Sequence, residues 1–256
     1  MGYTVIPIFE ALQVRRSQGK QFIPDVRSAD PVGFRGLPVI DSAPCSEGCS
    51  ACMEECPTGA ILLSPFRLDL GKCVFCDECA RVCPRDKVTF SNQYRLASRT
   101  RDGLVMKEGT STLSAVEANS RIQSLFGRSL KLRSVSAGGC NACEMEINAT
   151  SNVNFDSSRY GIDIVASPRH ADGLILSGPV TKNMAAALEL CYEGMPDPKF
   201  VIAVGACAIS GGVFEQSPVL DRSFLGRFTP ELFVAGCPAH PLSIVNGILD
   251  LLGQKG

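Results

Sequence analysis

The second half of the chain alternates short apolar runs with loops rich in turn-forming residues. Five runs are predicted to be strands, and they span residues 130–135, 162–166, 173–176, 200–204 and 232–235. The last three runs are apolar throughout, which is typical of buried, mostly parallel strands. Two further segments, 181–192 and 242–252, carry apolar side chains on one helical face and are predicted to be helices. The pattern therefore predicts a layered α/β domain.

The thirteen cysteines are unevenly distributed along the chain. Eight lie between residues 45 and 83, four more are Cys140, Cys143, Cys207 and Cys237, and Cys191 stands alone. The N-terminal sequence lacks the charged leader, apolar core and cleavage site of an export signal, so a reducing compartment is expected. Because thiols stay reduced there, the cysteines indicate metal or cluster ligation and not a disulfide scaffold.

The eight cysteines between residues 45 and 83 contain an internal repeat of 27 residues. Cys49, Cys52, Cys56 and Pro57 recur as Cys76, Cys79, Cys83 and Pro84. A duplicated half-domain is the simplest cause. The separation of Cys45 and Cys73 is 28 residues, so the first copy carries one extra residue between its first two cysteines. Gly48 lies in that gap, and we expect its conformational freedom to absorb the insertion.

The strings CSEGCSACMEECP and CVFCDECARVCP, which begin at Cys45 and Cys73, resemble bacterial two-cluster ferredoxins. In that family three closely spaced cysteines hold one 4Fe-4S cluster, and the distant fourth completes the other. The resemblance implies two ligand sets: Cys45, Cys49, Cys52 and Cys83 for the first cluster, and Cys73, Cys76, Cys79 and Cys56 for the second. The alternative for paired cysteines is two tetrahedral zinc sites.

The remaining cysteines follow predicted strands. Cys140 and Cys143 come after the first strand, Cys207 after the fourth and Cys237 after the fifth. In a parallel sheet these loops emerge at one edge, where open α/β sheets bind their ligands. Glycines that allow close backbone approach stand beside them, namely Gly138, Gly139, Gly205 and Gly236. The pattern predicts that four thiolates converge there. The alternative is buried structural cysteines, and we adopt it for Cys191.

Four segments of this half resemble the small-subunit family that nickel-iron hydrogenases share with the 20 kDa subunit of complex I. They are FGRSLKLRSVSAGGCNACEMEIN, DIVASPRHADGLILSGPVT, VGACAISGGVF and GCPAHPLSIVNGIL, and they lie between residues 124 and 252. The resemblance implies a flavodoxin-like fold. It also makes Cys140, Cys143, Cys207 and Cys237 the ligands of a third 4Fe-4S cluster, the one nearest the active site of the complex.

Details of the sequence separate the branches of this family. Complex I subunits have two adjacent cysteines where this chain has Cys140-Asn-Ala-Cys143, and that spacing resembles the hydrogenases. The surrounding FGRSL and CNACEMEIN are most similar to the membrane-associated, energy-converting group 4 enzymes, which include formate hydrogenlyase. Upstream, FRGLP at residues 34–38 resembles the separate ferredoxin subunit of those complexes. The resemblance therefore implies that the two polypeptides are fused in this chain.

These patterns divide the chain into four expected parts. Residues 1–40 are an N-terminal extension, and 41–90 are a ferredoxin-like α+β domain with two clusters. Residues 91–123 are a connector, because this stretch is polar and mixed and has no sustained apolar period. Residues 124–256 are a flavodoxin-like α/β domain with one cluster.

A few polar side chains are candidates for roles beside the third cluster. Glu144 directly follows Cys143, and the resemblance implies an acidic residue here that tunes the cluster or relays protons. The alternative is a helix N-terminal acid stabilised by the helix dipole. Arg169 and His170 lie in a loop expected at the same sheet edge, where hydrogen bonds can set a cluster's potential. A structural role is the alternative for both of them and for His240.

Composition and missing motifs narrow the function. A net charge of −1 gives no electrostatic case for nucleic acid, and no uncharged apolar run is long enough to span a bilayer. The sequence has no P-loop, no complete Gly-x-Gly-x-x-Gly and no nucleophile-base pairing, so nucleotide hydrolysis and acyl chemistry lack support. The family also implies that a nickel-iron centre needs two Cys-x2-Cys pairs, and the pairs of this chain are assigned to clusters. The catalytic centre of the oxidoreductase is therefore expected on a partner chain.

The sequence thus predicts an iron-sulfur electron-transfer subunit of a membrane-associated nickel-iron hydrogenase complex with three 4Fe-4S clusters. Its expected partners are a large nickel-iron subunit like the complex I 49 kDa subunit, membrane-embedded antiporter-like subunits, and an electron donor or acceptor at the ferredoxin end. The chain is expected in the cytoplasm, held by its partners on the inner face of the cell membrane. One alternative is a complex I-like oxidoreductase without hydrogenase activity that reduces quinone or another acceptor. The other is a zinc-stabilised assembly protein.

Overall fold

The cysteine repeat of the first half is also a repeat of secondary structure. The computed structural model describes residues 8–18 and 23–254. The first copy consists of β1 (Pro38–Ile40), α2 (Ala51–Glu54) and β2 (Ile61–Leu63), and the second of β3 (Phe66–Asp69), α3 (Glu78–Arg81) and β4 (Val88–Phe90). Each short helix begins two residues after the second cysteine of its copy. The duplication therefore extends from the cysteines to the elements that carry them.

The two copies pair with each other through a pseudo-twofold relationship. β1 pairs antiparallel with β4, and β2 pairs antiparallel with β3. Val39 lies opposite Thr89 in the first pair, and Leu62 lies opposite Arg67 in the second. Val39 and Arg67 hold equivalent places in the two copies, as do Leu62 and Thr89. The same register is therefore used twice.

The second half is built on a six-stranded, largely parallel sheet. Its strands lie in the order β5 (Ala97–Ser98), β11 (Leu232–Val234), β10 (Phe200–Val204), β9 (Gly173–Ser177), β7 (Leu130–Ser136) and β8 (Ile162–Ile164). Strands β7 to β11 are mutually parallel, and their order is 2-1-3-4-5 when they are numbered along the chain, as in flavodoxin. All five lie within two residues of their predicted ranges. The predicted α/β structure with a mostly parallel sheet is confirmed.

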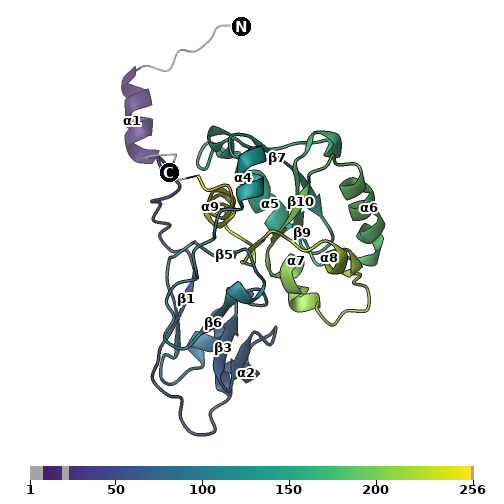
Figure 1. Cartoon of the computed structure of the whole chain (residues 1–256). Coiled ribbons are helices and arrows are strands. Elements are labelled where there is room, and N and C mark those ends of the chain that lie inside the picture. The colour runs from purple at the N-terminus through teal and green to yellow at the C-terminus, as the bar shows by residue number, and fades with distance from the viewer. Residues whose placement is uncertain (1–7, 19–22, 255–256) are drawn as a thin grey trace.

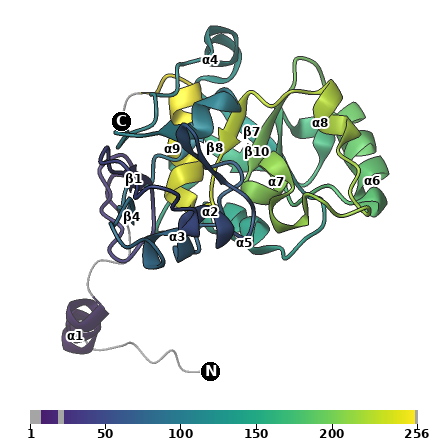
Figure 2. The same cartoon turned by 90° about the horizontal axis from the view of Figure 1, so that it is seen from below.

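Helices cover both faces of this sheet (Figure 2). On one face lie α6 (Lys182–Glu193), α7 (Ala206–Ser210) and α8 (Ser223–Arg227), and on the other lie α4 (Ser120–Phe126), α5 (Ala142–Ala149) and α9 (Pro241–Leu251). Successive strand residues point to opposite faces. Leu174 and Leu176 of β9 therefore pack on the α6 side, and Ile175 packs on the α9 side. Within the described ranges, no helix is long and apolar enough to cross a membrane.

The segment expected as a connector belongs to both sheets. β5 pairs antiparallel with β11 at the edge of the large sheet. β6 (Val105–Lys107) pairs antiparallel with β3 and so adds a third strand to the ferredoxin-like sheet. Between them η1 (Asp102–Leu104) buries its leucine completely. The segment is therefore an integral part of both sheets and not a simple connector. The boundary that was expected at residue 123 falls inside α4.

The expected N-terminal extension also contributes to the folded body. β1 precedes residue 41 and yet pairs with β4. Farther upstream, the side-chain amide of Asn246 in α9 donates to the Val26 carbonyl over 2.8 Å. Arg27 forms an ion pair with Asp250 of the same helix. α1 (Ile8–Gln18), by contrast, stands clear of this body in both views (Figures 1 and 2).

One apolar core runs from the ferredoxin-like region into the large sheet. It joins Leu68 and Phe75 of the former to Val135, Leu176 and Ile209 of the latter. Figure 1 shows the ferredoxin-like strands β3 and β6 below the large sheet, with β5 between them. The halves therefore pack together, and this packing fixes the positions of their cysteines relative to one another.

Candidate iron-sulfur sites

The first group of cysteines consists of Cys45, Cys49, Cys52 and Cys83, although Cys83 comes from the other copy of the repeat. Cys52 is buried, and burial raises the pKa of its thiol. The neighbouring thiols of Cys83, Cys45 and Cys49 raise that pKa further. Three of the four, Cys45, Cys49 and Cys83, line one small hollow at the surface. The four side chains therefore surround one site.

The second group consists of Cys56, Cys73, Cys76 and Cys79, and all four line another hollow. Burial raises the pKa of Cys73 and of Cys79 to about 12, and neighbouring thiols of the group add to both shifts. Cys56 crosses over from the first copy just as Cys83 crosses over from the second. The grouping has the crossed pattern that the resemblance to two-cluster ferredoxins implies.

Backbone N–H groups point at the two crossing cysteines in the same way. The N–H of Ala60 donates to Cys56 Sγ over 3.2 Å, and the N–H of Lys87 donates to Cys83 Sγ over 3.3 Å. Ala60 and Lys87 are 27 residues apart and hold equivalent places in the two copies. Hydrogen bonds of this kind stabilise thiolate sulfur and help to set the potential of a bound cluster.

The residue before the second cysteine of each copy has a left-handed backbone. Gly48 has a φ of +70°, and Phe75, at the same place in the second copy, has a φ of 55°. Phe75 keeps this strained conformation while its N–H donates to Cys73 Sγ over 3.3 Å. The left-handed turn thus belongs to the motif itself. The expectation that Gly48 absorbs the extra residue is therefore wrong: the insertion lies in residues 46–47, and Gly48 has the same conformation as its equivalent in the copy without an insertion.

The third group, Cys140, Cys143, Cys207 and Cys237, lies at the carboxyl edge of the parallel sheet. Cys140 follows β7, Cys207 follows β10 and Cys237 follows β11. Burial raises the pKa of Cys143 and of Cys207 to about 11. The thiols of Cys237, Cys207 and Cys140 add to the rise at Cys143, and a hydrogen bond from the Ala239 N–H opposes it. The structure therefore brings together four cysteines from three loops.

A glycine makes room for this third group. Gly205 has a φ of +87°, and a Cβ atom here would lie 2.5 Å from Cys143 Sγ. Gly212, with a φ of +55°, approaches Cys207 in a similar way, because its Cβ would lie 3.0 Å from that sulfur. Only residues without a side chain fit so close to the sulfurs without strain.

All three groups fit the binding of iron-sulfur clusters. Thiolates ligate such clusters, and a buried thiolate needs positive charge beside it. The raised pKa values mean that Cys73 and Cys143 hold their protons at neutral pH until iron displaces them. Among residues 8–18 and 23–254, no set of three or more His, Cys, Asp or Glu side chains is arranged to hold a single metal ion.

The second group is the neighbour of both the others. Cys52 of the first group raises the pKa of Cys79, and Cys76 of the second group raises that of Cys237. Both effects require that the thiols lie close together. The three groups therefore form a continuous series that leads from the ferredoxin-like region to the edge of the large sheet.

Sequence reasoning missed Arg222, which supports the loop of Cys207. Its guanidinium donates to the four backbone carbonyls of Pro179, Cys207, Ala208 and Ile209, over 3.2, 3.0, 2.8 and 3.0 Å. Its positive charge also opposes part of the rise that burial causes in the pKa of the Cys207 thiol. No motif marks an arginine that is recruited from a distant turn, so the local sequence holds no signal for this role.

Arg169 and His170 lie away from the third group, and the prediction that they share its sheet edge is wrong. They belong to η3 (Pro168–His170), on the crossover from β8 to β9. Just beyond it, the Asp172 N–H donates to the carbonyl of the second residue of β7 over 2.7 Å. Cys140 follows the other end of β7. β8 pairs only with the first three residues of β7, so this loop begins before the carboxyl edge is reached.

Two acidic residues lie on the helix of the third group. Glu144 is in the first turn of α5, directly after Cys143, and is half-buried. Glu146 follows in the next turn, and burial raises the pKa of its carboxyl group. Sequence reasoning singled out only the first of them, because adjacency to a cysteine is visible in the sequence and burial is not.

His240 has a structural role at the start of α9. Its Nδ1 accepts a hydrogen bond from the Leu242 N–H over 3.1 Å and so caps the helix. The ring packs against Phe34 and Phe155, at centroid distances of 4.8 and 5.7 Å. Burial lowers the pKa of the imidazole, which keeps it neutral and able to accept this hydrogen bond. Cys191 packs against the core from α6.

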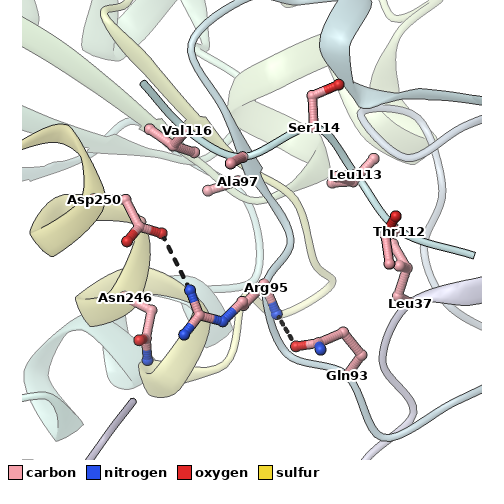
Figure 3. Close-up of a pocket in the computed structure, with 12 residues that line it drawn as sticks. Leu37, Gln93, Arg95, Ala97, Thr112, Leu113, Ser114, Val116, Asn246 and Asp250 are labelled. Carbon is pink, nitrogen blue, oxygen red and sulfur yellow. Dashed lines mark hydrogen bonds and ion pairs between the residues drawn. The ribbon is translucent and has the colours of Figure 1, made fainter. Parts of the chain in front are cut away.

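A separate cavity of about 230 Å³ lies between the connector and α9 (Figure 3). Its wall is mostly apolar and includes Leu37, Leu113 and Val116. On one side Arg95 pairs with Asp250 at 3.7 Å. No cysteine lines this cavity, so it is not part of the three cysteine sites.

Two sequence families match the chain. The model of the family described as NADH ubiquinone oxidoreductase, 20 kDa subunit, matches residues 140–251. The model of the 4Fe-4S binding domain matches residues 66–86. The first match contains all four cysteines of the third group, and the second contains four of the eight ferredoxin-like cysteines. The redox character of both regions is thus supported independently of the geometry.

Three curated relatives have informative names. The probable membrane-bound hydrogenase subunit mbhJ of Pyrococcus furiosus is 44% identical over 125 residues, which are 48% of this chain and 74% of the relative. Formate hydrogenlyase subunit 7 of Escherichia coli is 40% identical and is covered to 51%, over 50% of this chain. An NADH-quinone oxidoreductase subunit of Geotalea daltonii is 42% identical and is covered to 69%, over 46% of this chain. The chain therefore belongs to the family of the 20 kDa subunit of NADH ubiquinone oxidoreductase, with a 4Fe-4S ferredoxin-like region fused on its N-terminal side.

Proposed function

We propose that this chain is the iron-sulfur subunit of a membrane-associated nickel-iron hydrogenase complex, similar to formate hydrogenlyase, and that it relays electrons through three 4Fe-4S clusters. The observation that carries the proposal is the series of three neighbouring cysteine groups, each assembled from separate segments. Bound clusters supply one-electron redox steps. The chain supplies the thiolates, the N–H donors to sulfur and the exclusion of water from the buried ligands.

Each cluster takes its ligands from one group. The proposed sets are Cys45, Cys49, Cys52 and Cys83 for the first cluster, Cys56, Cys73, Cys76 and Cys79 for the second, and Cys140, Cys143, Cys207 and Cys237 for the third. The middle set is the most enclosed, since Cys73 and Cys79 are buried. This suits a cluster that exchanges electrons only with the other two.

The two ends of the series are open to partners. Cys45 of the first group is exposed, as are Cys140 and Cys237 of the third. An electron donor or acceptor protein would therefore reach the first cluster directly. The large nickel-iron subunit, which would contain the catalytic centre, would cover the third.

Exposed apolar side chains around the third group support that second contact. Met145 lies two residues after Cys143 and is 64% exposed, and Val213, in the turn η4 (Gly212–Phe214) after α7, is 58% exposed. Apolar side chains gathered beside a functional group are typical of a protein interface. Through the large subunit and membrane-embedded antiporter-like subunits, the chain would be held on the inner face of the cell membrane.

Glu144 is proposed as a proton relay beside the third cluster. Its place directly after Cys143, in a half-buried first turn, supports this role. Glu144→Gln should slow proton-coupled turnover of the complex and leave the iron content unchanged. Glu146→Gln on the same helix is the matched comparison. If the two variants lower activity equally, the effect belongs to the helix and not to Glu144.

A complex I-like oxidoreductase that reduces quinone or another acceptor is the second candidate, and the NADH-quinone oxidoreductase relative from Geotalea daltonii favours it. The spacing of Cys140 and Cys143 favours the hydrogenase. Hydrogen evolution by the purified complex, with nickel analysis of the large subunit, separates the two. A complex that lacks nickel and reduces only quinone would refute the hydrogenase.

Metal analysis of the purified chain tests the three-cluster relay itself. Three 4Fe-4S clusters require about twelve iron and twelve acid-labile sulfide atoms per chain. Zinc without sulfide would instead support the assembly protein, and about eight iron atoms would remove one cluster from the proposal.

Cysteine variants test the crossed ligand sets. Cys83→Ala should remove the same electron paramagnetic resonance signal as Cys45→Ala, although these cysteines belong to different copies. Cys56→Ala should remove the signal that Cys73→Ala removes. Cys237→Ala should leave both of these signals and remove the third. If Cys83→Ala instead removed the signal that Cys73→Ala removes, the crossing would be disproved.

A further inference from the structure

The duplication is broken at one buried position beside the crossing cysteines. Ala60 and Lys87 are equivalent, and the N–H of each donates to the sulfur of the cysteine four residues before it. Their side chains differ in charge. Ala60 is 2% exposed and contributes only a methyl group, whereas Lys87 is 3% exposed and brings a cation to the same place. A lysine is almost never buried to this extent unless it is paired.

The Lys87 ammonium is held by specific contacts. Nζ donates to the Ala43 carbonyl over 2.6 Å and to Glu108 Oε1 over 2.9 Å. It also lies 5.4 Å from the centroid of the Phe66 ring, on which a cation is stabilised. These partners offset the cost of taking an ammonium group out of water.

These contacts place the charge beside the first cysteine group. Ala43 lies two residues before Cys45, and Lys87 lies four residues after Cys83. Lys87 lines the same hollow as Cys45, Cys49 and Cys83. Two other charged residues line that hollow, Asp41 and Arg85; both are exposed and of opposite sign. Lys87 is therefore the buried charge of this site.

The partner carboxylate does not cancel this charge. The side chain of Glu108 is 46% exposed, and that of Lys87 is 4% exposed. Water screens a charge that faces it, and a charge inside the protein is screened much less. The site therefore retains a net positive field.

The second group has no equivalent buried cation at position 60. The Arg35 guanidinium donates to the Phe75 carbonyl over 2.7 Å, but it also pairs with Asp77 at 2.8 Å. The Arg35 side chain is 45% exposed. Its charge is thus both neutralised and hydrated, unlike that of Lys87.

We propose that the buried ammonium of Lys87 raises the reduction potential of the first cluster above that of its twin in the second group. Reduction adds one negative charge to a cluster, and a cation buried nearby stabilises the reduced form. This inference rests on the proposed function, because it requires that both groups bind clusters. The loss of equivalence at this one position then contributes a difference in potential between the two clusters.

Redox titration of the purified full chain, followed by electron paramagnetic resonance, tests the inference. The two signals are assigned from Cys45→Ala and Cys73→Ala. Lys87→Met keeps the length of the side chain and removes the charge. At a fixed potential it should lower the ratio of reduced to oxidised first cluster about tenfold, which is about 59 mV for a one-electron couple. The second cluster should shift by a smaller amount.

Glu108→Gln is the opposite test. It leaves Lys87 charged and removes its acidic partner, so the potential of the first cluster should rise. Lys107→Met removes a charge from the neighbouring residue, which is exposed, and should change neither potential. If Lys87→Met fails to bind the first cluster, the direction of the shift in Glu108→Gln decides the question.

The outcomes separate this inference from the proposed function. A first-cluster potential that is unchanged in both variants, or equal shifts of both clusters, would overturn the role of Lys87 and leave the three-cluster relay intact. A wild-type chain that contains no iron and sulfide would overturn the proposed function itself.

Discussion

Lys72 Nζ lies 2.8 and 2.9 Å from the two carboxylate oxygens of Glu215, and this ion pair joins the loop before Cys73 to the turn behind Cys207. A second pair lies nearby, where the Arg101 guanidinium donates to both oxygens of Asp69 over 2.7 and 2.6 Å. Two ionic contacts thus accompany the apolar packing at the point where the second and third cysteine groups meet.

The two ion pairs should differ in their contribution to stability. Lys72→Met should lower the free energy of unfolding by less than about 1 kcal/mol, because both partners are partly exposed. Asp69→Asn should cost about 1–3 kcal/mol, since Asp69 binds Arg101 through two oxygens and also accepts the Gly71 N–H over 2.9 Å. Urea unfolding of the cluster-loaded chain measures both. Equal losses would show that the geometry of the second pair adds nothing.

Gly205→Ala should damage the third site selectively. The new Cβ would lie 2.5 Å from Cys143 Sγ at a φ of +87°, so either the backbone or the sulfur must move. We expect a loss of at least about 1–2 kcal/mol and a large loss of the third resonance signal. Gly226→Ala is the matched control, because an added Cβ meets nothing within 4 Å there, in helix α8. It should be neutral or slightly stabilising.

Arg222→Leu should loosen the loop of Cys207. The substitution removes a donor from four backbone carbonyls, of which only that of Cys207 keeps another, the Gly211 N–H over 2.9 Å. An unsatisfied buried acceptor costs about 1–3 kcal/mol. The third signal should weaken or broaden while the first two remain. Arg222→Lys should restore part of the signal, since it keeps a charge and fewer donors. If Arg222→Leu left the third signal and the unfolding midpoint unchanged, the role of this arginine would be refuted.

His240 should make stability fall at acidic pH. Burial lowers its pKa from the ordinary value of 6.5, so the folded chain binds fewer protons there than the unfolded chain. Its contribution is complete above about 6.5 and is lost as the pH falls through the lowered pKa, because protonated Nδ1 cannot cap α9. His240→Asn keeps an acceptor at the helix N-terminus and should flatten this dependence.

His170 is the control for that titration. The chain has two histidines, and His170 is exposed, so His170→Gln should leave the acid branch of the stability curve unchanged. Urea midpoints measured from pH 5 to 8 make the comparison. A steeper fall in His240→Asn than in the wild-type chain would contradict the assignment.

Much of the large sheet could be predicted because three of its strands, β9, β10 and β11, are buried on both faces. Such strands are continuous apolar runs, as in β9 and β10, and the helices between them have clear amphipathic periods. The meeting of Cys140, Cys207 and Cys237 then followed from topology alone, since parallel strands all end at one edge. The same argument gave the wrong place for Arg169, because β8 is short and the crossover that follows it turns back before the carboxyl edge.

Other features depend on contacts between distant segments and leave no local pattern. β5 is two residues long, too short to carry any period, and it is a strand only because β11 lies beside it. Arg222 and Lys87 look like ordinary surface cations in the sequence. Their burial becomes visible only when the carbonyls of Ala43 and Ala208 are brought to them by the fold.

The sharing of one segment between two sheets also limits how the gene can be divided. A fragment that begins at the large domain would lack β5 and leave the backbone of β11 unpaired along an open flank. The complementary fragment, if cut before β6, would lose the strand that lies beside β3. Each piece would expose a strand edge with unpaired backbone groups, which is prone to self-association. Separate expression of the two cluster-bearing parts should thus succeed only when residues 94–107 are duplicated in both.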